Sequence, residues 1–249
     1  LEVGSTATAY VPYENICPIE GWDGVVVHND DGIVVPEEYQ KVEYLESTGT
    51  QWINTEIIGS PNIVVNCDIE IPSDRTIGNE GILGSRQSSA GGRMYLVSFY
   101  GNEWELGLGN QDVIFNNGYK VGRNKKISVV AEYANQIYSI IIDGMLTKTG
   151  SFSYEGNEYP MYLFACNNFG TAARHCASRV YKVTIYKNEV LVLNFIPCFR
   201  KSDNKPGMYD TVTQTFFTNQ GTGEFICGPD VGQTTSYEFG ALGKNKYIS

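Results

Sequence analysis

The segment 178–219 constrains the fold of this chain more than any other stretch. Its apolar residues alternate with polar ones at a period close to two, which is typical of half-buried strands and does not fit a helix. The alternating apolar positions are Val180, Val183, Ile185, Val190, Val192 and Phe195. The polar tripeptide Lys187-Asn188-Glu189 interrupts the run and predicts a tight hairpin turn. A second hairpin is predicted over 208–217, so the rest of the chain has a β-sheet to pack against.

The remaining sequence repeats this pattern of short strands and turns. Strands are predicted at 44–46, 50–55, 63–71, 81–85, 93–100, 103–109, 112–115, 126–133, 136–142, 145–147 and 161–166, with turns or loops at 116–118, 134–135, 143–144 and 167–177. The 17 Tyr and 27 Gly among 249 residues favour strands and turns, and no segment has the pattern of a three-turn amphipathic helix. The sequence therefore predicts an all-β fold, a two-sheet antiparallel sandwich or a barrel.

Composition divides the chain into three parts. Residues 38–229 carry the strand pattern and are predicted to form one large β domain. Residues 1–37 are interpreted as a connector, or the end of a neighbouring β module, and the polar residues 230–249 as a tail. Because the chain starts at Leu1, it is interpreted as a fragment or a processed product. The sequence shows no signal peptide and no apolar run of the roughly 18 residues that a membrane span needs.

The net charge of −10 limits the kinds of partner. Binding to a phosphate backbone requires clustered Lys and Arg side chains. The pairs Lys125-Lys126 and Arg200-Lys201 are too sparse for such a patch, so no nucleic-acid partner is predicted. Carbohydrate binding does not depend on net charge, and a glycan partner remains compatible with this composition.

The six cysteines are Cys17, Cys67, Cys166, Cys176, Cys198 and Cys227. Their wide, irregular spacing contains no CxxC motif, and only His28 and His175 could join them as nitrogen ligands, which argues against a zinc site. Buried free thiols that pack as small apolar side chains are the favoured interpretation. A disulfide such as Cys166–Cys176 remains an alternative.

Several motifs of the large domain resemble the laminin-G-like, concanavalin A-like domains of gut bacterial surface proteins and phage tail proteins. The motifs are Tyr39-Gln40, the run from Tyr44 to Ile53 (YLESTGTQWI), Ile142-Asp143-Gly144, Leu163-Phe164-Ala165, Phe195-Ile196-Pro197-Cys198, the run from Gly207 to Val212, Phe216-Phe217-Thr218-Asn219 and Gly221-Thr222-Gly223. The resemblance covers about 39–229. Separately, the first thirteen residues, LEVGSTATAYVPY, resemble the closing strand of modules in tail proteins of phages and prophages of gut Firmicutes.

The resemblance implies a jelly-roll sandwich of two antiparallel sheets. Relatives commonly bind glycans or proteins through loops at one rim or through the concave sheet, and some hold calcium with Asp, Asn and backbone carbonyls. Fold does not fix function, so the site has to be argued from its own residues.

Catalysis would need a suitable set of acids or a nucleophile with its base. Glucanase relatives carry Glu-x-Asp-x-x-Glu on one strand, with the carboxyl groups of a retaining pair about 5 Å apart. The pairs Asp68/Glu70 and Glu103/Glu105 have the right i, i+2 spacing, but neither is followed by the third acid. The two histidines lie in predicted loops without a supporting motif. The chain is therefore predicted not to be an enzyme.

A glycan site would need aromatic platforms and polar side chains near exposed loops. The predicted ligand-binding residues are Arg86, Arg93, Tyr95, Trp104, Asn167, Asn168, Arg174 and His175. The segment 167–175 is long for a hairpin connection, and long loops on a rigid scaffold often carry function. No metal site is predicted, although Asp203, Asn204 and Asp210 are weak candidates for calcium, the one cofactor left open.

These observations favour non-catalytic adhesion, in which a phage tail or cell-surface protein recognises a glycan on a host surface. The alternative is a structural or assembly module of a virion with no ligand of its own, and a glycoside hydrolase comes third. The predicted partners are a host-surface glycan or protein and further subunits, in a homo-oligomer, without membrane insertion. The predicted location is the virion or the cell surface.

Overall fold

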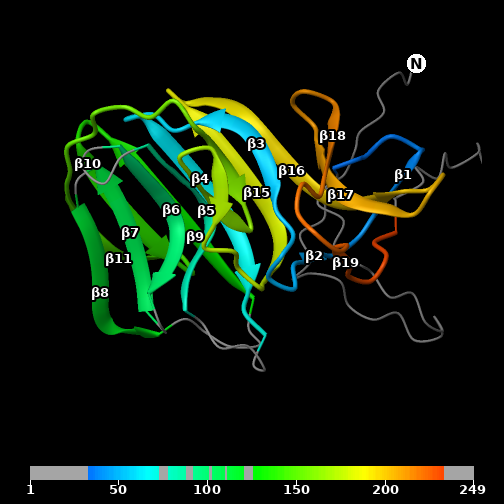
Figure 1. Ribbon diagram of the computed structural model, residues 1–249, viewed down its shortest axis with the longest axis horizontal. Helices are drawn as coiled ribbons and strands as arrows, with labels where there is room; N and C mark the ends of the chain where they lie inside the picture. Colours follow the sequence, from blue (N-terminus) through cyan, green and yellow to red (C-terminus); the bar gives the residue numbers. More distant parts are fainter. Residues whose placement is uncertain are drawn as a thin grey trace, which may run out of the picture.

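The computed structural model describes residues 33–72, 78–87, 92–100, 103–109, 111–120 and 126–232, with only the backbone at 95, 106, 111–120 and 127. Within these ranges the chain forms strands and turns and no helix, so no membrane-spanning helix is found among them. Figure 1 shows two layered sheets, with β6, β7 and β8 in the layer that lies over β9, β10 and β11. The predicted all-β sandwich is confirmed.

The larger sheet has the strand order β11-β10-β9-β4-β15-β16-β17-β18, with β1 beside β16 and β2 between β15 and β19. Its strands are β1 (Tyr39–Lys41), β2 (Leu45–Glu46), β4 (Ile63–Glu70), β9 (Ile127–Ala134), β10 (Ile137–Ile142), β11 (Met145–Ser151), β15 (Arg179–Lys187), β16 (Val190–Arg200), β17 (Lys205–Asp210), β18 (Thr215–Thr218) and β19 (Ile226–Cys227). All of its strand pairs are antiparallel.

The smaller sheet has the order β14-β13-β5-β6-β7-β8, with β12 beside β5 and β3 beside β12. Its strands are β3 (Ile53–Ile58), β5 (Asn79–Arg86), β6 (Arg93–Tyr100), β7 (Glu103–Gly109), β8 (Gln111–Lys120), β12 (Pro160–Leu163), β13 (Ala165–Asn168) and β14 (Thr171–Ala173).

The core lies between the facing sides of the two sheets. In β4 the odd positions from 63 to 69 are buried and the even positions from 64 to 68 are half-buried, as the alternation in the sequence predicts. Leu83, Leu96 and Phe99 of the smaller sheet pack into the same cluster. The outer side of β4 is therefore available for a site.

The strand β16 connects the sandwich to a second, smaller apolar cluster. Its first half pairs with β15, and its second half pairs with β17 and β1, to the right in Figure 1. Val35, Ile196, Cys198 and Tyr209 form the centre of this second cluster. Segment 178–219 therefore spans both clusters, which explains why its pattern dominates the sequence.

The predicted strand 161–166 is divided in two at Phe164. This residue has φ 65°, in the left-handed region, and is completely buried. Its N–H donates to Ile82 O at 2.7 Å and its carbonyl accepts from Cys176 N at 2.8 Å, which holds the turn. As a result β12 runs antiparallel to β5 whereas β13 runs parallel to it, an exception to the purely antiparallel prediction.

The turn predicted at 116–118 is wrong, because these residues belong to β8. The register between β7 and β8 changes between Glu103, which faces Lys120, and Trp104, which faces Phe115. Residues 116–119 fall in that gap in the register. The turn-forming residues therefore produce an irregularity within one strand and do not end it.

The ends of the large domain extend slightly past the predicted boundaries. Val35 is buried in the second cluster, and Val231 N donates to Lys41 O at 2.9 Å. Residues 1–32 and 233–249 lie outside the described residues, so the division at 37 and 229 stays a prediction.

The five described cysteines are free, so the Cys166–Cys176 disulfide is not present. Cys166 packs directly against Gly81, where even a Cβ atom would collide with its sulfur. Burial raises the pKa of Cys166 to about 12 and that of Cys227 to about 11. These thiols act as small core side chains. Cys17 and His28 lie outside the described residues.

Candidate functional site

Four of the predicted ligand-binding residues lie near one another at one end of the smaller sheet. Arg86 pairs with Arg93 across β5 and β6, and with Asn168 across β5 and β13. The Arg86 guanidinium lies 5.7 Å from the ring centre of Phe169, which is 48% exposed. Asn167 precedes Asn168 on β13, but it has a different role.

The segment predicted as a long loop is a tight hairpin. Asn168 pairs with Thr171, and Phe169-Gly170 form a two-residue turn with φ values of 54° and 86°. Asn167 is buried: its side-chain amide donates to Pro160 O at 2.9 Å, and its Oδ1 accepts from Gly170 N at 2.8 Å. Asn167 therefore stabilises the hairpin and has no free group for a ligand.

Trp104 cannot serve as an exposed aromatic platform. Its side chain is 2% exposed and lies in the core, edge-on to Phe99 with the ring centres 4.8 Å apart. The alternation within β7 directs Trp104 inward, because Glu105 occupies the opposite face. Tyr95 pairs with Gly84 and Gly107 in the middle of the smaller sheet, and only its backbone is described.

Arg174 forms a buried ion pair with Glu105 and also donates to Phe99 O. The two side chains are 20% and 7% exposed, so the pair belongs to the fold and not to an open rim. His175 follows it, and desolvation by burial lowers the pKa of this imidazole. Neither residue is brought together with the Arg86 group by any described contact.

Three of the four acids considered for catalysis are held in structural contacts. Glu70 accepts hydrogen bonds from Arg179 at 2.9 Å and from the Tyr181 hydroxyl at 2.5 Å. Asp68 forms an ion pair with Lys126 at 3.3 Å. Glu105 is paired with Arg174, as described above.

The calcium candidates are separated by the length of β17. Asp203 precedes this strand and pairs with Arg200 at 2.7 Å, whereas Asp210 ends it. Asp210 is buried and accepts from Asn194 N, Val212 N and Thr213, so it shapes the turn after β17. Asn204 has φ 55° in the turn before the strand. Within the described ranges, no group of three or more His, Cys, Asp or Glu could hold a metal ion.

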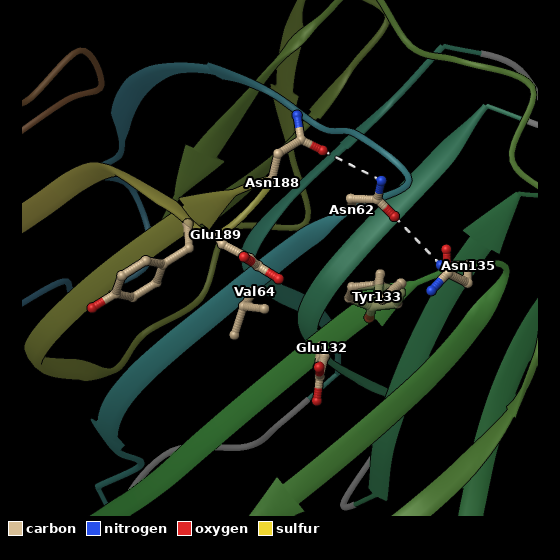
Figure 2. A pocket seen from close by; sticks show the side chains of 9 residues that line it. Asn62, Val64, Glu132, Tyr133, Asn135, Asn188 and Glu189 are labelled. Atoms are coloured by element: carbon tan, nitrogen blue, oxygen red, sulfur yellow. Dashed lines mark hydrogen bonds between the residues drawn. The ribbon is translucent and has the colours of Figure 1, made fainter.

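A pocket of about 350 Å³ opens on the outer side of the larger sheet, at one end of β4, β9 and β15. We call it the asparagine pocket; its lining residues are Asn62, Val64, Glu132, Tyr133, Ala134, Asn135, Tyr186, Asn188 and Glu189. Figure 2 shows it from close by. Its size is within the range of small-molecule sites.

Three neighbouring strands form the floor and walls of the pocket. Val64 faces Glu132 on β9 and Tyr186 on β15 in the register of the sheet, so the three side chains form one row. Because neighbouring strands lie about 4.8 Å apart, the two outer residues of the row are about 10 Å apart at their backbones. The smaller Val64 between two larger side chains leaves the hollow.

Two hairpin turns close the end of the pocket. Asn135-Gln136 joins β9 to β10, and Asn188-Glu189 joins β15 to β16; all four residues have positive φ, between 49° and 66°. Such two-residue turns suit the twist of paired strands and tolerate asparagine well. The sequence predicted both hairpins, the first with its turn one residue earlier, at 134–135.

Asn62 connects the two turns, as the dashed lines in Figure 2 show. Its Nδ2 donates to Asn188 Oδ1 at 3.3 Å, and its Oδ1 accepts from Asn135 N at 3.4 Å. Asn188 N also donates to Asn62 O at 3.1 Å. Asn62 and Asn188 are therefore held together, and the three asparagines form a polar wall.

The exposed polar groups of the pocket suit a ligand rich in hydroxyl groups. The Asn135 and Asn188 side chains offer amide donors and acceptors, and Glu132 and Glu189 offer carboxylate acceptors. In Figure 2 the carboxylate of Glu189 extends toward Val64. The side chains of Val64 and Tyr186, both half-buried, add apolar surface. Tyr133 is fully buried and its ring packs in the core against Phe152.

This pocket was not predicted from the sequence. Asn188, Glu189 and Asn135 were predicted only as turn residues, and Glu132 and Tyr186 only as strand residues. The one available signal was the presence of asparagines at both hairpin turns. Their proximity depends on the order β9-β4-β15, which the sequence does not reveal.

Comparisons with known proteins support the fold and leave the family open. No family model matches the chain, and no curated protein matches it. The crystal structure of a proposed carbohydrate-binding protein from Bacteroides ovatus is similar, with a TM-score of 0.55 and 12% identity over 77% of this chain. The match spans 62% of that protein, so part of it has no counterpart here.

A variant of the NanB sialidase from Streptococcus pneumoniae also matches, with a TM-score of 0.43 and 9% identity over 78% of this chain and 39% of the sialidase. Identities this low are informative about the fold alone. The β-sandwich of the Bacteroides ovatus protein agrees with the jelly-roll, lectin-like fold that the sequence motifs imply.

Proposed function

We propose that this chain is a non-catalytic carbohydrate-binding domain and that the asparagine pocket holds the sugar. The observation that carries the proposal is the row Glu132–Val64–Tyr186, closed at one end by the linked asparagines. It combines an apolar floor, one aromatic wall and several exposed polar groups in a single hollow.

The rigidity of this wall favours binding. A ligand that meets mobile side chains must order them, at a cost of about 0.5–1.5 kcal/mol for each. Asn62 and Asn188 are already fixed by their mutual hydrogen bond, and the two turns are fixed by their strands. Less ordering is therefore required when a sugar enters.

The similarity to the Bacteroides ovatus structure, that of a proposed carbohydrate-binding protein, gives further support at the level of the fold. The proposal also includes the biological setting implied by the sequence motifs. In that setting the domain belongs to a phage tail or a cell-surface protein and recognises glycans on a host surface. Several copies in a homo-oligomer would raise weak single-site affinity through multivalency.

A glycan array probed with the intact chain tests the proposal. Asn188→Gly is the most informative variant, because glycine keeps the positive φ of the turn and removes the side chain from the pocket. Gln136→Gly is the matched control, since Gln136 occupies the second position of the other turn and does not line the pocket.

The expected result is binding to a defined set of glycans, lost or at least tenfold weaker in Asn188→Gly and Tyr186→Ala and retained in Gln136→Gly. Equal binding by all variants would move the site away from the asparagine pocket. A blank array for the intact oligomer would contradict carbohydrate binding and favour a structural module.

A further inference from the structure

We infer that the asparagine pocket selects glycans by charge: it rejects acidic sugars and prefers sugars that carry a free amino group over their neutral counterparts. This inference rests on the proposed function and adds the chemical class of the ligand. It follows from the arrangement of charged side chains in and around the pocket.

The pocket contains two carboxylates and no cationic side chain among its described lining residues. Glu132 lies on β9 and Glu189 in the turn after β15, on opposite sides of Val64. Both residues are exposed, and neither makes an ion pair or side-chain hydrogen bond with another described residue. The electrostatic potential in the pocket is therefore negative.

The lysines on or beside these strands do not neutralise this negative potential. Lys182 lies on the same face of β15 as Tyr186 but four residues away, opposite Asp68. Lys187 pairs with Ile63, whose side chain is buried, so alternation directs Lys187 away from the face that carries Val64 and Tyr186. Lys126 lies toward the opposite end of β4, where it pairs with Asp68 at 3.3 Å. The chain as a whole carries a net charge of −10, which adds to the effect at long range.

A sugar in the pocket would lie within a few ångströms of both carboxylates. A carboxylate or sulfate on that sugar would be repelled, whereas an ammonium group would be attracted and would donate charge-assisted hydrogen bonds to Glu132 or Glu189. Neutral hydroxyl and acetamido groups would form ordinary hydrogen bonds with the asparagines. The predicted order of affinity is amino sugar, then neutral sugar, then acidic sugar.

An array of matched glycans tests this order. It carries the same backbones with a neutral terminal sugar, a terminal sugar with a free amine, or a terminal sialic or uronic acid, and is probed at 20 mM and 500 mM salt. At low salt the acidic members are expected to bind about tenfold more weakly than the amine members. The difference is expected to shrink at high salt, where charges are screened within about 4 Å.

The double variant Glu132→Gln/Glu189→Gln separates charge from shape, because glutamine keeps the size and the acceptor oxygen. It is expected to bind the three classes within twofold of one another and to lose the salt dependence. Acidic glycans that bind the wild-type chain as well as neutral ones do would overturn the inference and leave the proposed function intact. An unchanged order of affinity in the double variant would also overturn the inference and leave the proposed function intact. A blank array overturns both.

Discussion

Asn167 and Asn188 are asparagines of two tight hairpins, Asn167 on the strand before its turn and Asn188 within its turn, and their side chains serve different purposes. Asn167 is buried and uses both ends of its amide to hold the β13–β14 hairpin. Asn188 is exposed and accepts one hydrogen bond from Asn62, so its amide nitrogen remains available to a ligand. The sequence suggested the opposite assignment, because burial depends on which strand covers each turn.

His175 provides a pH-dependent prediction. Burial lowers the pKa of its imidazole, so the folded chain binds fewer protons than the unfolded chain below the unfolded pKa of about 6.5. The free energy of unfolding is therefore expected to fall as the pH decreases from about 7 to 5. In His175→Gln this contribution disappears, and urea unfolding at pH 7.5 and 5.5 should show a smaller loss. An equal loss in both proteins would assign the pH dependence to other groups.

The ion pair between Arg174 and Glu105 gives a prediction about stability. Arg174→Met leaves the buried Glu105 carboxylate without its cation, which is expected to lower the free energy of unfolding by about 3–5 kcal/mol. Arg174→Met/Glu105→Leu is expected to regain most of this loss, because no charge remains buried. Denaturant unfolding of the wild-type chain, Arg174→Met, Glu105→Leu and the double variant forms a double-mutant cycle.

The exposed Arg200–Asp203 pair is the control for this cycle. Arg200→Met should leave stability unchanged, since exposed ion pairs contribute little. If Arg174→Met also left the free energy of unfolding unchanged, the buried ion pair would not stabilise the fold.

At the level of elements, the hairpin turns show a conflict between stability and the site. Glu189 has φ 66°, a backbone conformation that residues other than glycine adopt at a cost in free energy. Glu189→Gly should raise the free energy of unfolding by up to about 1 kcal/mol and weaken binding of amine-bearing glycans. Gln136→Gly, at φ 62° in the equivalent turn, should stabilise similarly without changing binding. Thermal unfolding and the array measure the two effects, and destabilisation by both would contradict this view of the turns.

Period-two alternation was sufficient to predict most strands, because one side of each faces the core. It predicted the buried odd positions of β4 and both hairpins that enclose the pocket. It failed at Phe164, where backbone hydrogen bonds to Ile82 and Cys176 hold a bulky residue at positive φ. Such tertiary contacts override local preference and are invisible in the sequence.

The site was harder to predict than the fold. Trp104 and Asn167 were chosen for chemical type, and both are buried. The asparagine pocket depends on Asn62, Glu132 and Tyr186 meeting across three strands that are far apart in the sequence. The order of those strands in the sheet determines the pocket, and residue pattern alone does not fix that order.

For the whole molecule, the five described cysteines predict a β domain whose fold does not depend on redox conditions. The five described thiols are free, and burial raises the pKa of Cys166 and Cys198 to about 12. A thiol reagent at pH 8 should therefore react with these five slowly in the native chain and fully after denaturation. A reducing agent should leave the melting temperature unchanged. Rapid native labelling of the four buried thiols would contradict the packing described here.

The measurement that tests the central claim most directly is a crystal structure of the intact chain with the strongest glycan from the array. The proposal predicts sugar density between Glu132 and Tyr186, over Val64, with hydrogen bonds to Asn188 or Asn135. Density elsewhere, such as against Arg86 and Phe169 at the end of the smaller sheet, with an empty asparagine pocket would contradict it.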